Sequence, residues 1–223
     1  MLIFDETVRW IQISSTAVFL VLLMGKTIYL RRKERLNAII FGSGRERSSS
    51  LFSILSVLAV NIWIAFILFY HLHEGFYSGL SPLRISGIDA IWVKIIGLIL
   101  LLTAFAILII AQLALGNSWR LGIDRIHPGR LVTGDIYSYS RHPIYLFFDL
   151  YFFSVFLLSA NLVFLMFTVV IALILHLQAL AEEKFLISIH GTAYRDYISR
   201  VGMYITVAPG SSLQDARQSD TTD

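Results

Sequence analysis

The sequence predicts an all-α, polytopic membrane protein with five transmembrane helices, of which the last two form a helical hairpin. First, 57% of its 223 residues are hydrophobic, only 15% are charged and the mean hydropathy is +0.72, whereas soluble domains carry about 25% charged residues. Second, apolar runs long enough to cross roughly 30 Å of hydrocarbon recur along the chain. Third, basic residues gather between these runs, as membrane orientation requires.

The first three apolar runs are predicted to cross the membrane at about residues 10–30, 51–70 and 88–115. The first run follows Asp5 and Glu6 rather than basic residues, and it is longer than the core of a signal peptide. It is therefore interpreted as a transmembrane helix. The segments between the three runs, about 31–50 and 71–86, are predicted to be loops.

The apolar region from 144 to 181 is predicted to be a helical hairpin. It is too long for one crossing, and Ser-Ala-Asn at 159–161 suits a tight turn at its middle. Each arm would span roughly 26 Å at the helical rise of 1.5 Å per residue. An amphipathic helix is expected to continue from Glu182 toward Arg200.

The distribution of basic residues predicts the orientation. All but three of the 18 Lys and Arg residues lie in or beside the first loop, the third loop or the C-terminal region. The exceptions are Arg9, Arg84 and Lys94. With five crossings, an extracytoplasmic N-terminus places every basic cluster in the cytoplasm, together with the C-terminus.

Ionisable residues flank the predicted hairpin and are the leading functional candidates. Residues 141–145 (Arg-His-Pro-Ile-Tyr) enter the hairpin, and Glu182 and Glu183 leave it, so both groups should meet at the cytoplasmic surface. Pro143 suits a first helical turn, and the free N–H groups of that turn favour a ligand carboxylate. The two glutamates would sit at a helix C-terminus, where the dipole disfavours anions and a cationic ligand is expected. The alternative is that these are ordinary solvated interfacial charges.

Residues from Leu115 to about Met203 resemble the isoprenylcysteine carboxyl methyltransferase and phospholipid methyltransferase superfamily of integral membrane enzymes. The resemblance rests on five motifs, which are Gly116-Asn117-Ser118-Trp119-Arg120, Arg130-Leu131-Val132-Thr133, Tyr137 through Tyr145, Glu182-Glu183, and His190 through Tyr197. The pattern RHPxY, followed by an apolar stretch and EE, is the cofactor signature of the superfamily.

This resemblance implies a methyltransferase that uses S-adenosylmethionine at the cytoplasmic membrane face. It implies cofactor contacts from Tyr137, Arg141, His142, Pro143, Tyr145, Glu182 and Glu183, with His142 and Tyr145 as candidate catalytic residues. The acceptor would be amphiphilic or lipid-linked, either isoprenylcysteine carboxylate-like or phospholipid-like. The family's Gly-Pro-Tyr is replaced by residues 135–137 (Asp-Ile-Tyr), so a different turn is expected there. Gln178 and its neighbours supply no arginine before Glu182, which weighs against a prenylcysteine carboxylate.

The expected organisation has three parts. Residues 1–114 hold the first three spans, 115–207 form the cofactor-binding catalytic region, and 208–223 form a polar, disordered tail. Within the hairpin, Asp149 and His176 are candidate substrate residues. Because Asp149 lies seven residues after His142 and His176 seven before Glu183, the two should approach within hydrogen-bonding reach, directly or through a water.

Two alternative functions remain open, an NADPH-dependent enzyme like the membrane sterol reductases and a catalytically inactive membrane binding or scaffold protein. No nucleic-acid partner is predicted, because membrane orientation accounts for the basic clusters. The absence of cysteine excludes thiolate zinc sites and cysteine nucleophiles. No metal site is predicted, since His71, His73 and Glu74 have no further ligands near them in the sequence.

Overall fold

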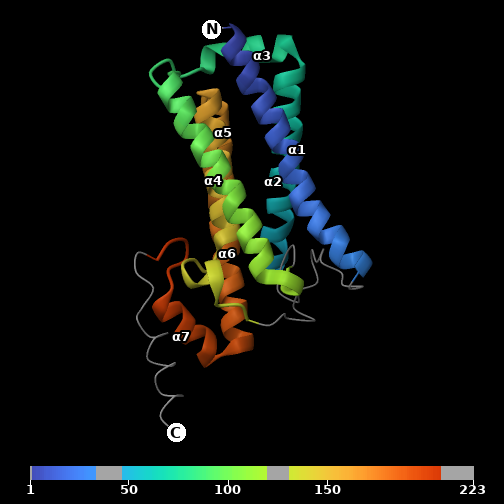
Figure 1. Cartoon of the computed structure of the whole chain (residues 1–223), viewed down its shortest axis with the longest axis vertical. Helices are drawn as coiled ribbons and strands as arrows, with labels where there is room; N and C mark the ends of the chain where they lie inside the picture. Colours follow the sequence, from blue (N-terminus) through green and yellow to red (C-terminus); the bar gives the residue numbers. More distant parts are fainter. Residues whose placement is uncertain (1, 34–46, 120–130, 207–223) are drawn as a thin grey trace.

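The computed structural model describes residues 2–33, 47–119 and 131–206. The main helices are α1 (Leu2–Lys33), α2 (Arg47–Leu72), α3 (Glu74–Leu80), α4 (Ile91–Leu115), α5 (Pro143–Ser159), α6 (Leu162–His190) and α7 (Thr192–Arg200). Short 3-10 turns lie at η1 (Ser81–Leu83), η2 (Gly116–Ser118) and η3 (Asp135–Ser138). Figure 1 shows the long helices running along the bundle, with α7 at the end opposite the N-terminus.

Four helices, α1, α2, α4 and α6, are long and apolar enough to cross a membrane, and α5 is a shorter apolar helix of 17 residues. The chain is therefore a multi-pass integral membrane protein. One predicted loop was wrong in detail, because residues 71–86 contain α3 and η1. Phe76 and Tyr77 hold this short helix on the bundle by packing against Phe66 and Tyr70, with ring centroids 5.6 and 5.1 Å apart respectively.

The predicted hairpin turn is confirmed. Helix α5 ends at Ser159, Ala160 adopts the left-handed conformation with φ of +47°, and the Asn161 side chain caps α6 by accepting the Val163 N–H at 2.9 Å. The chain before α4 braces this turn, since Asn161 donates its side-chain N–H to the Leu80 carbonyl at 3.0 Å.

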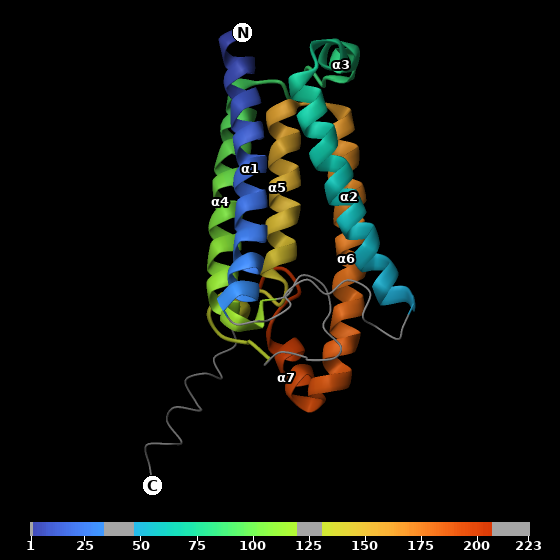
Figure 2. The same cartoon turned by 90° about the vertical axis from the view of Figure 1, so that its right-hand side faces the viewer.

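Helix α5 occupies the centre of the bundle, between α4 and α6, as Figure 2 shows. Its aromatic side chains pack against those of the first two helices. The Tyr151 ring lies 5.3 Å from that of Phe19, and the Phe152 ring lies 5.0 Å from that of Trp63. These rings fix the position of α5 and hence of the residues that precede it.

Helix α6 differs from the prediction at its C-terminal end. Glu182 and Glu183 do not end a helix, because residues 182–190 (EEKFLISIH) contain no helix breaker and α6 continues to His190. It stops at Gly191, whose φ of +55° favours glycine, and α7 follows at once. The helix-terminus argument for a cationic ligand is therefore wrong. The predicted tail, 208–223, lies outside the described residues.

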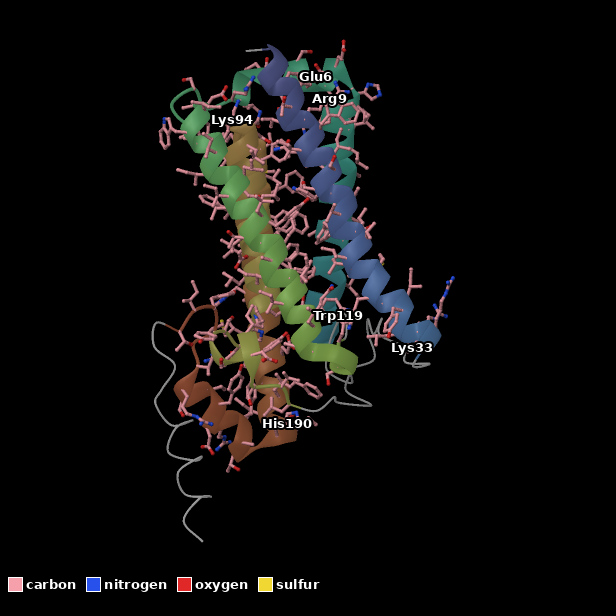
Figure 3. All side chains as sticks on the ribbon, viewed as in Figure 1. Glu6, Arg9, Lys33, Lys94, Trp119 and His190 are labelled. Atoms are coloured by element: carbon pink, nitrogen blue, oxygen red, sulfur yellow. The ribbon has the colours of Figure 1, made fainter. Side chains whose placement is uncertain are left out.

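The two ends of the bundle differ in the residues they carry. Figure 3 shows Lys33 and His190 at one end and Glu6, Arg9 and Lys94 at the other. The basic last turn of α1 thus lies at the same end as α7 and the start of α5.

Candidate active site

The site lies where α5 begins, and the segment after α7 builds part of it. As predicted, Pro143 lies in the first turn of α5, and its side chain is buried. The backbone N–H groups of Arg141 and His142 both bond to carbonyls of that segment, those of Gly202 and Met203, at 3.1 Å each. These two N–H groups are therefore not available to a ligand, and the predicted carboxylate site at the N–H groups of the first α5 turn stays a prediction.

Glu183 is the centre of a charged cluster. Its Oε1 atom accepts hydrogen bonds from Arg141 Nε and Nη2, each at 2.8 Å, and lies 3.1 Å from His142 Nε2. Arg141 also donates through Nη1 to the carbonyls of Ile198 and Val201. Arg141 thus balances the charge of Glu183 and ties α6 to the end of α7.

Glu182 has a different environment from its neighbour. Its Oε2 atom accepts the Tyr145 hydroxyl at 2.9 Å and lies 3.9 Å from His142 Nδ1. Its side chain is 33% exposed, whereas that of Glu183 is 12% exposed. The start of α5 and the C-terminal part of α6 therefore meet as predicted, and Glu182 is the more exposed of the two carboxylates.

Three buried tyrosines surround these carboxylates. Tyr137 lies in η3, and its carbonyl accepts the Tyr197 hydroxyl at 2.5 Å. Burial raises the pKa of the Tyr137 hydroxyl far above its usual range, and the Glu182 carboxylate adds to this. Burial also raises the pKa values of Tyr194 and Tyr197. All three hydroxyls therefore stay protonated and can donate hydrogen bonds at physiological pH.

Asp149 of α5 and His176 of α6 form no direct hydrogen bond or ion pair with each other. His176 Nδ1 is instead 3.1 Å from the Tyr204 hydroxyl, and the two rings stack with centroids 6.0 Å apart. Asp149 Oδ1 is buried and has no hydrogen-bond partner among the described residues. The predicted direct hydrogen bond between Asp149 and His176 is wrong, because His176 Nδ1 contacts the Tyr204 hydroxyl instead.

No site role was predicted for Tyr194, Tyr197 or Tyr204. The first two lie in the His190–Tyr197 motif. That motif supported the family resemblance, but its tyrosines were not predicted to belong to the site. Nothing in the local sequence around Tyr204 indicates that residues 202–206 return to pair with residues 139–142. Only the backbone hydrogen bonds reveal that pairing.

A family model described as phospholipid methyltransferase matches residues 92–193. This match runs from the first turn of α4 to the start of α7. The resemblance noted from the motifs is confirmed, and the matched segment also takes in α4. No curated protein sequence matches the chain. The phospholipid methyltransferase segment contains all five of the residues Arg141, His142, Tyr145, Glu182 and Glu183.

The side chains present fit S-adenosylmethionine, which carries a sulfonium and an ammonium as well as a carboxylate. Glu182 offers a partly exposed carboxylate, and no Lys or Arg in the described parts of the chain lies within ion-pair distance of it. Glu183, by contrast, is already balanced by Arg141. The site therefore has one negative charge free for a cation.

Proposed function

We propose that this chain is an S-adenosylmethionine-dependent methyltransferase acting on an amphiphilic, phospholipid-like acceptor at the cytoplasmic membrane face. The observation that carries the proposal is the meeting of Arg141, His142 and Tyr145 with Glu182 and Glu183 inside the segment that the phospholipid methyltransferase family model matches.

The residues of the site divide into two roles in this proposal. Glu182 binds the positively charged part of the cofactor, and Tyr145 holds the Glu182 carboxylate in place through its 2.9 Å hydrogen bond. Glu183, Arg141 and His142 form the support that fixes α5 against α6. When bound, the cofactor supplies an activated methyl group, and the protein's task is alignment and exclusion of water.

The acceptor is proposed to be a lipid whose tail stays in the bilayer while its head reaches the site. Gln178, one turn before Glu182, is buried and accepts a hydrogen bond from Ser56 of α2. That position is thus used for helix packing and supplies no cation for a prenylcysteine carboxylate. A phospholipid-like head group is favoured.

The proposed topology has five crossings, with α5 as the shortest. An extracytoplasmic N-terminus places the basic last turn of α1 and the site on the cytoplasmic side, where S-adenosylmethionine is made. Residues 115–207 are proposed as the cofactor-binding region and 1–114 as the part that anchors it.

Calorimetric titration of the purified protein with S-adenosylmethionine, and separately with NADPH, tests the proposal. We expect S-adenosylmethionine to bind and NADPH not to bind. Glu182→Gln should weaken S-adenosylmethionine binding by about 10- to 100-fold, because a cation loses its charge partner. Glu74→Gln is the matched control, since it removes an exposed carboxylate from α3 at the other end of the molecule.

Each other outcome of the titration has a definite meaning. Binding of NADPH alone would favour a reductase, and binding of neither ligand would favour a scaffold protein. Wild-type affinity in Glu182→Gln would show that the cationic subsite has been assigned to the wrong residue.

A further inference from the structure

Asn61 places a side-chain amide on the outward face of a membrane helix. The apolar span of α2 runs from Ile54 to Leu72, and Asn61 lies about 10 Å along the axis from its first residue and about 16 Å from its last. The side chain is exposed and donates from Nδ2 to the Val57 carbonyl of its own helix at 2.8 Å. Among the described residues its amide oxygen accepts no hydrogen bond, and lipid tails at this depth have none to donate.

The other amide side chains of the described membrane helices all join one helix to another. Gln12 of α1 donates to a carbonyl of α5, and Gln112 of α4 donates to a carbonyl of α1, at 3.1 Å each. Gln178 of α6 accepts a hydrogen bond from Ser56 of α2. These three amides are buried. Asn61 differs from them in being exposed and in bonding within its own helix, so the helix that it would join is missing from this chain.

The residues around Asn61 have the spacing of a helix-packing surface. Exposed side chains recur along α2 at intervals of four, three, four and seven residues, at Ile54, Leu58, Asn61, Ala65 and Leu72. This is the spacing of the core positions through which two helices interlock, and Asn61 occupies one of the central positions. The α2 seam formed by these five residues is about 27 Å long, close to the thickness of the hydrocarbon. Figure 2 shows α2 at the edge of the bundle, where a further helix has access to it.

We propose that the α2 seam is a homodimer interface, in which two copies of the chain pack seam to seam about a two-fold axis along the membrane normal. Such an axis brings the same residue of both copies together at the same depth. An amide both donates and accepts, so the two Asn61 side chains complete each other's hydrogen bonding. Ala65 lies one turn further on and is small enough to let the two backbones approach. The interface uses no residue of the proposed cofactor site, so it does not depend on the proposed function.

Photobleaching-step counting of the full chain, labelled at its N-terminus, measures the association in phosphatidylcholine liposomes. We expect the dimer fraction of the wild type to rise with the ratio of protein to lipid. Asn61→Leu should raise the dissociation constant by about 3- to 10-fold, the effect of losing one interhelical hydrogen bond in a membrane. It replaces a lipid-facing amide by an apolar side chain, so thermal unfolding of the monomer should not fall below that of wild type.

Thr103→Leu is the matched control for this substitution. It removes an exposed polar side chain of α4, whose hydroxyl donates to the carbonyl four residues earlier at 2.8 Å. A hydroxyl has one proton and this bond uses it, so Thr103→Leu should dimerise like wild type. A wild-type protein that stays monomeric at every ratio would overturn the proposal, as would an unchanged dissociation constant in Asn61→Leu.

Oxidative cross-linking then locates the interface, because the native chain has no cysteine. Ala65→Cys should form a disulfide-linked dimer in liposomes, since the two-fold axis brings the two thiols together. Ala106→Cys is the control, because it replaces an exposed alanine of α4, and it should stay monomeric at the same ratio of protein to lipid. Equal cross-linking of the two variants, or cross-linking of Ala106→Cys alone, would contradict an interface on α2.

Discussion

Two adjacent glutamates of α6 differ in environment although they share a motif. Neighbouring residues on a helix point about 100° apart, so Glu182 and Glu183 address different partners. Glu183 accepts two hydrogen bonds from Arg141, each at 2.8 Å. Glu182 accepts a hydrogen bond from the Tyr145 hydroxyl at 2.9 Å. One glutamate therefore stabilises the structure, and the other remains available to a ligand.

Glu183→Gln should lower the free energy of unfolding by about 3 kcal/mol, because a largely buried Arg141 loses its counter-charge. Glu182→Gln should change it by less than about 1 kcal/mol, since that side chain is partly exposed. Thermal unfolding in detergent measures both. Equal destabilisation by the two substitutions would contradict the division of roles.

Asp135 occupies a backbone conformation that side chains rarely adopt. Its φ is +52°, whereas the preceding Gly134 is extended, so the turn before Tyr137 places its left-handed residue at an aspartate. Asp135→Val should destabilise the protein by about 1–2 kcal/mol, because a branched side chain is strained there. Asp135→Gly, the matched control, should be neutral or stabilising in the same thermal assay.

The close packing of helix α4 against helix α5 sets the position of the site. A side chain added at Gly97 would have its Cβ 3.1 Å from Leu157 Cβ and 3.2 Å from the Ser154 carbonyl oxygen. Small residues permit such backbone contacts between membrane helices. Because Pro143 begins α5, any shift of this helix moves Arg141 and His142 away from α6.

Gly97→Leu should therefore separate α4 from α5, destabilise the protein by about 1–3 kcal/mol, and weaken S-adenosylmethionine binding. Gly25→Leu is the control, because nothing lies within 4 Å of a Cβ added at that position of α1. The readouts are thermal unfolding and calorimetric titration. Similar losses in both variants would point to a general effect of leucine rather than to the α4–α5 contact.

The sequence predicted the helices better than it predicted their ends and contacts. Hydrophobic runs located the membrane helices, and the Ser-Ala-Asn segment at 159–161 marked the turn between α5 and α6, because both signals are local. Helix beyond Glu182 was predicted, but a helix end was wrongly placed at Glu182 and Glu183, because an apolar-to-polar change was interpreted as a terminus; α6 runs without a break to His190. The return of residues 202–206 to the start of α5 depends on tertiary pairing and has no local pattern.

The distribution of basic residues is the basis of the proposed orientation of the whole molecule in the membrane. The site and the basic end of α1 lie at one end of the bundle, and α3 lies at the other. The proposed orientation therefore puts α7 in the cytoplasm and α3 outside. In this proposed orientation the site has access to both the proposed cytosolic cofactor and the proposed lipid acceptor.

Single cysteines test the orientation, because the native chain has none. Ser78→Cys on α3 should react with a membrane-impermeant maleimide in intact cells, and Ser199→Cys on α7 should react only after permeabilisation. Both serines are exposed, so accessibility within the fold does not distinguish them. The reverse pattern would invert the proposed topology, and labelling of both positions in intact cells would exclude an odd number of crossings between them.

The partly buried carboxylate of Asp149 in α5 also constrains how the protein is made. A helix of 17 residues with Asp149 near its middle is a weak candidate for insertion by itself, since a central aspartate costs about 3 kcal/mol at the translocon. Helix α6 is longer and apolar, and the turn at Ala160 joins the two directly. The two helices should therefore enter the bilayer as one unit, and a nascent chain that stops before α6 should leave α5 in the cytosol.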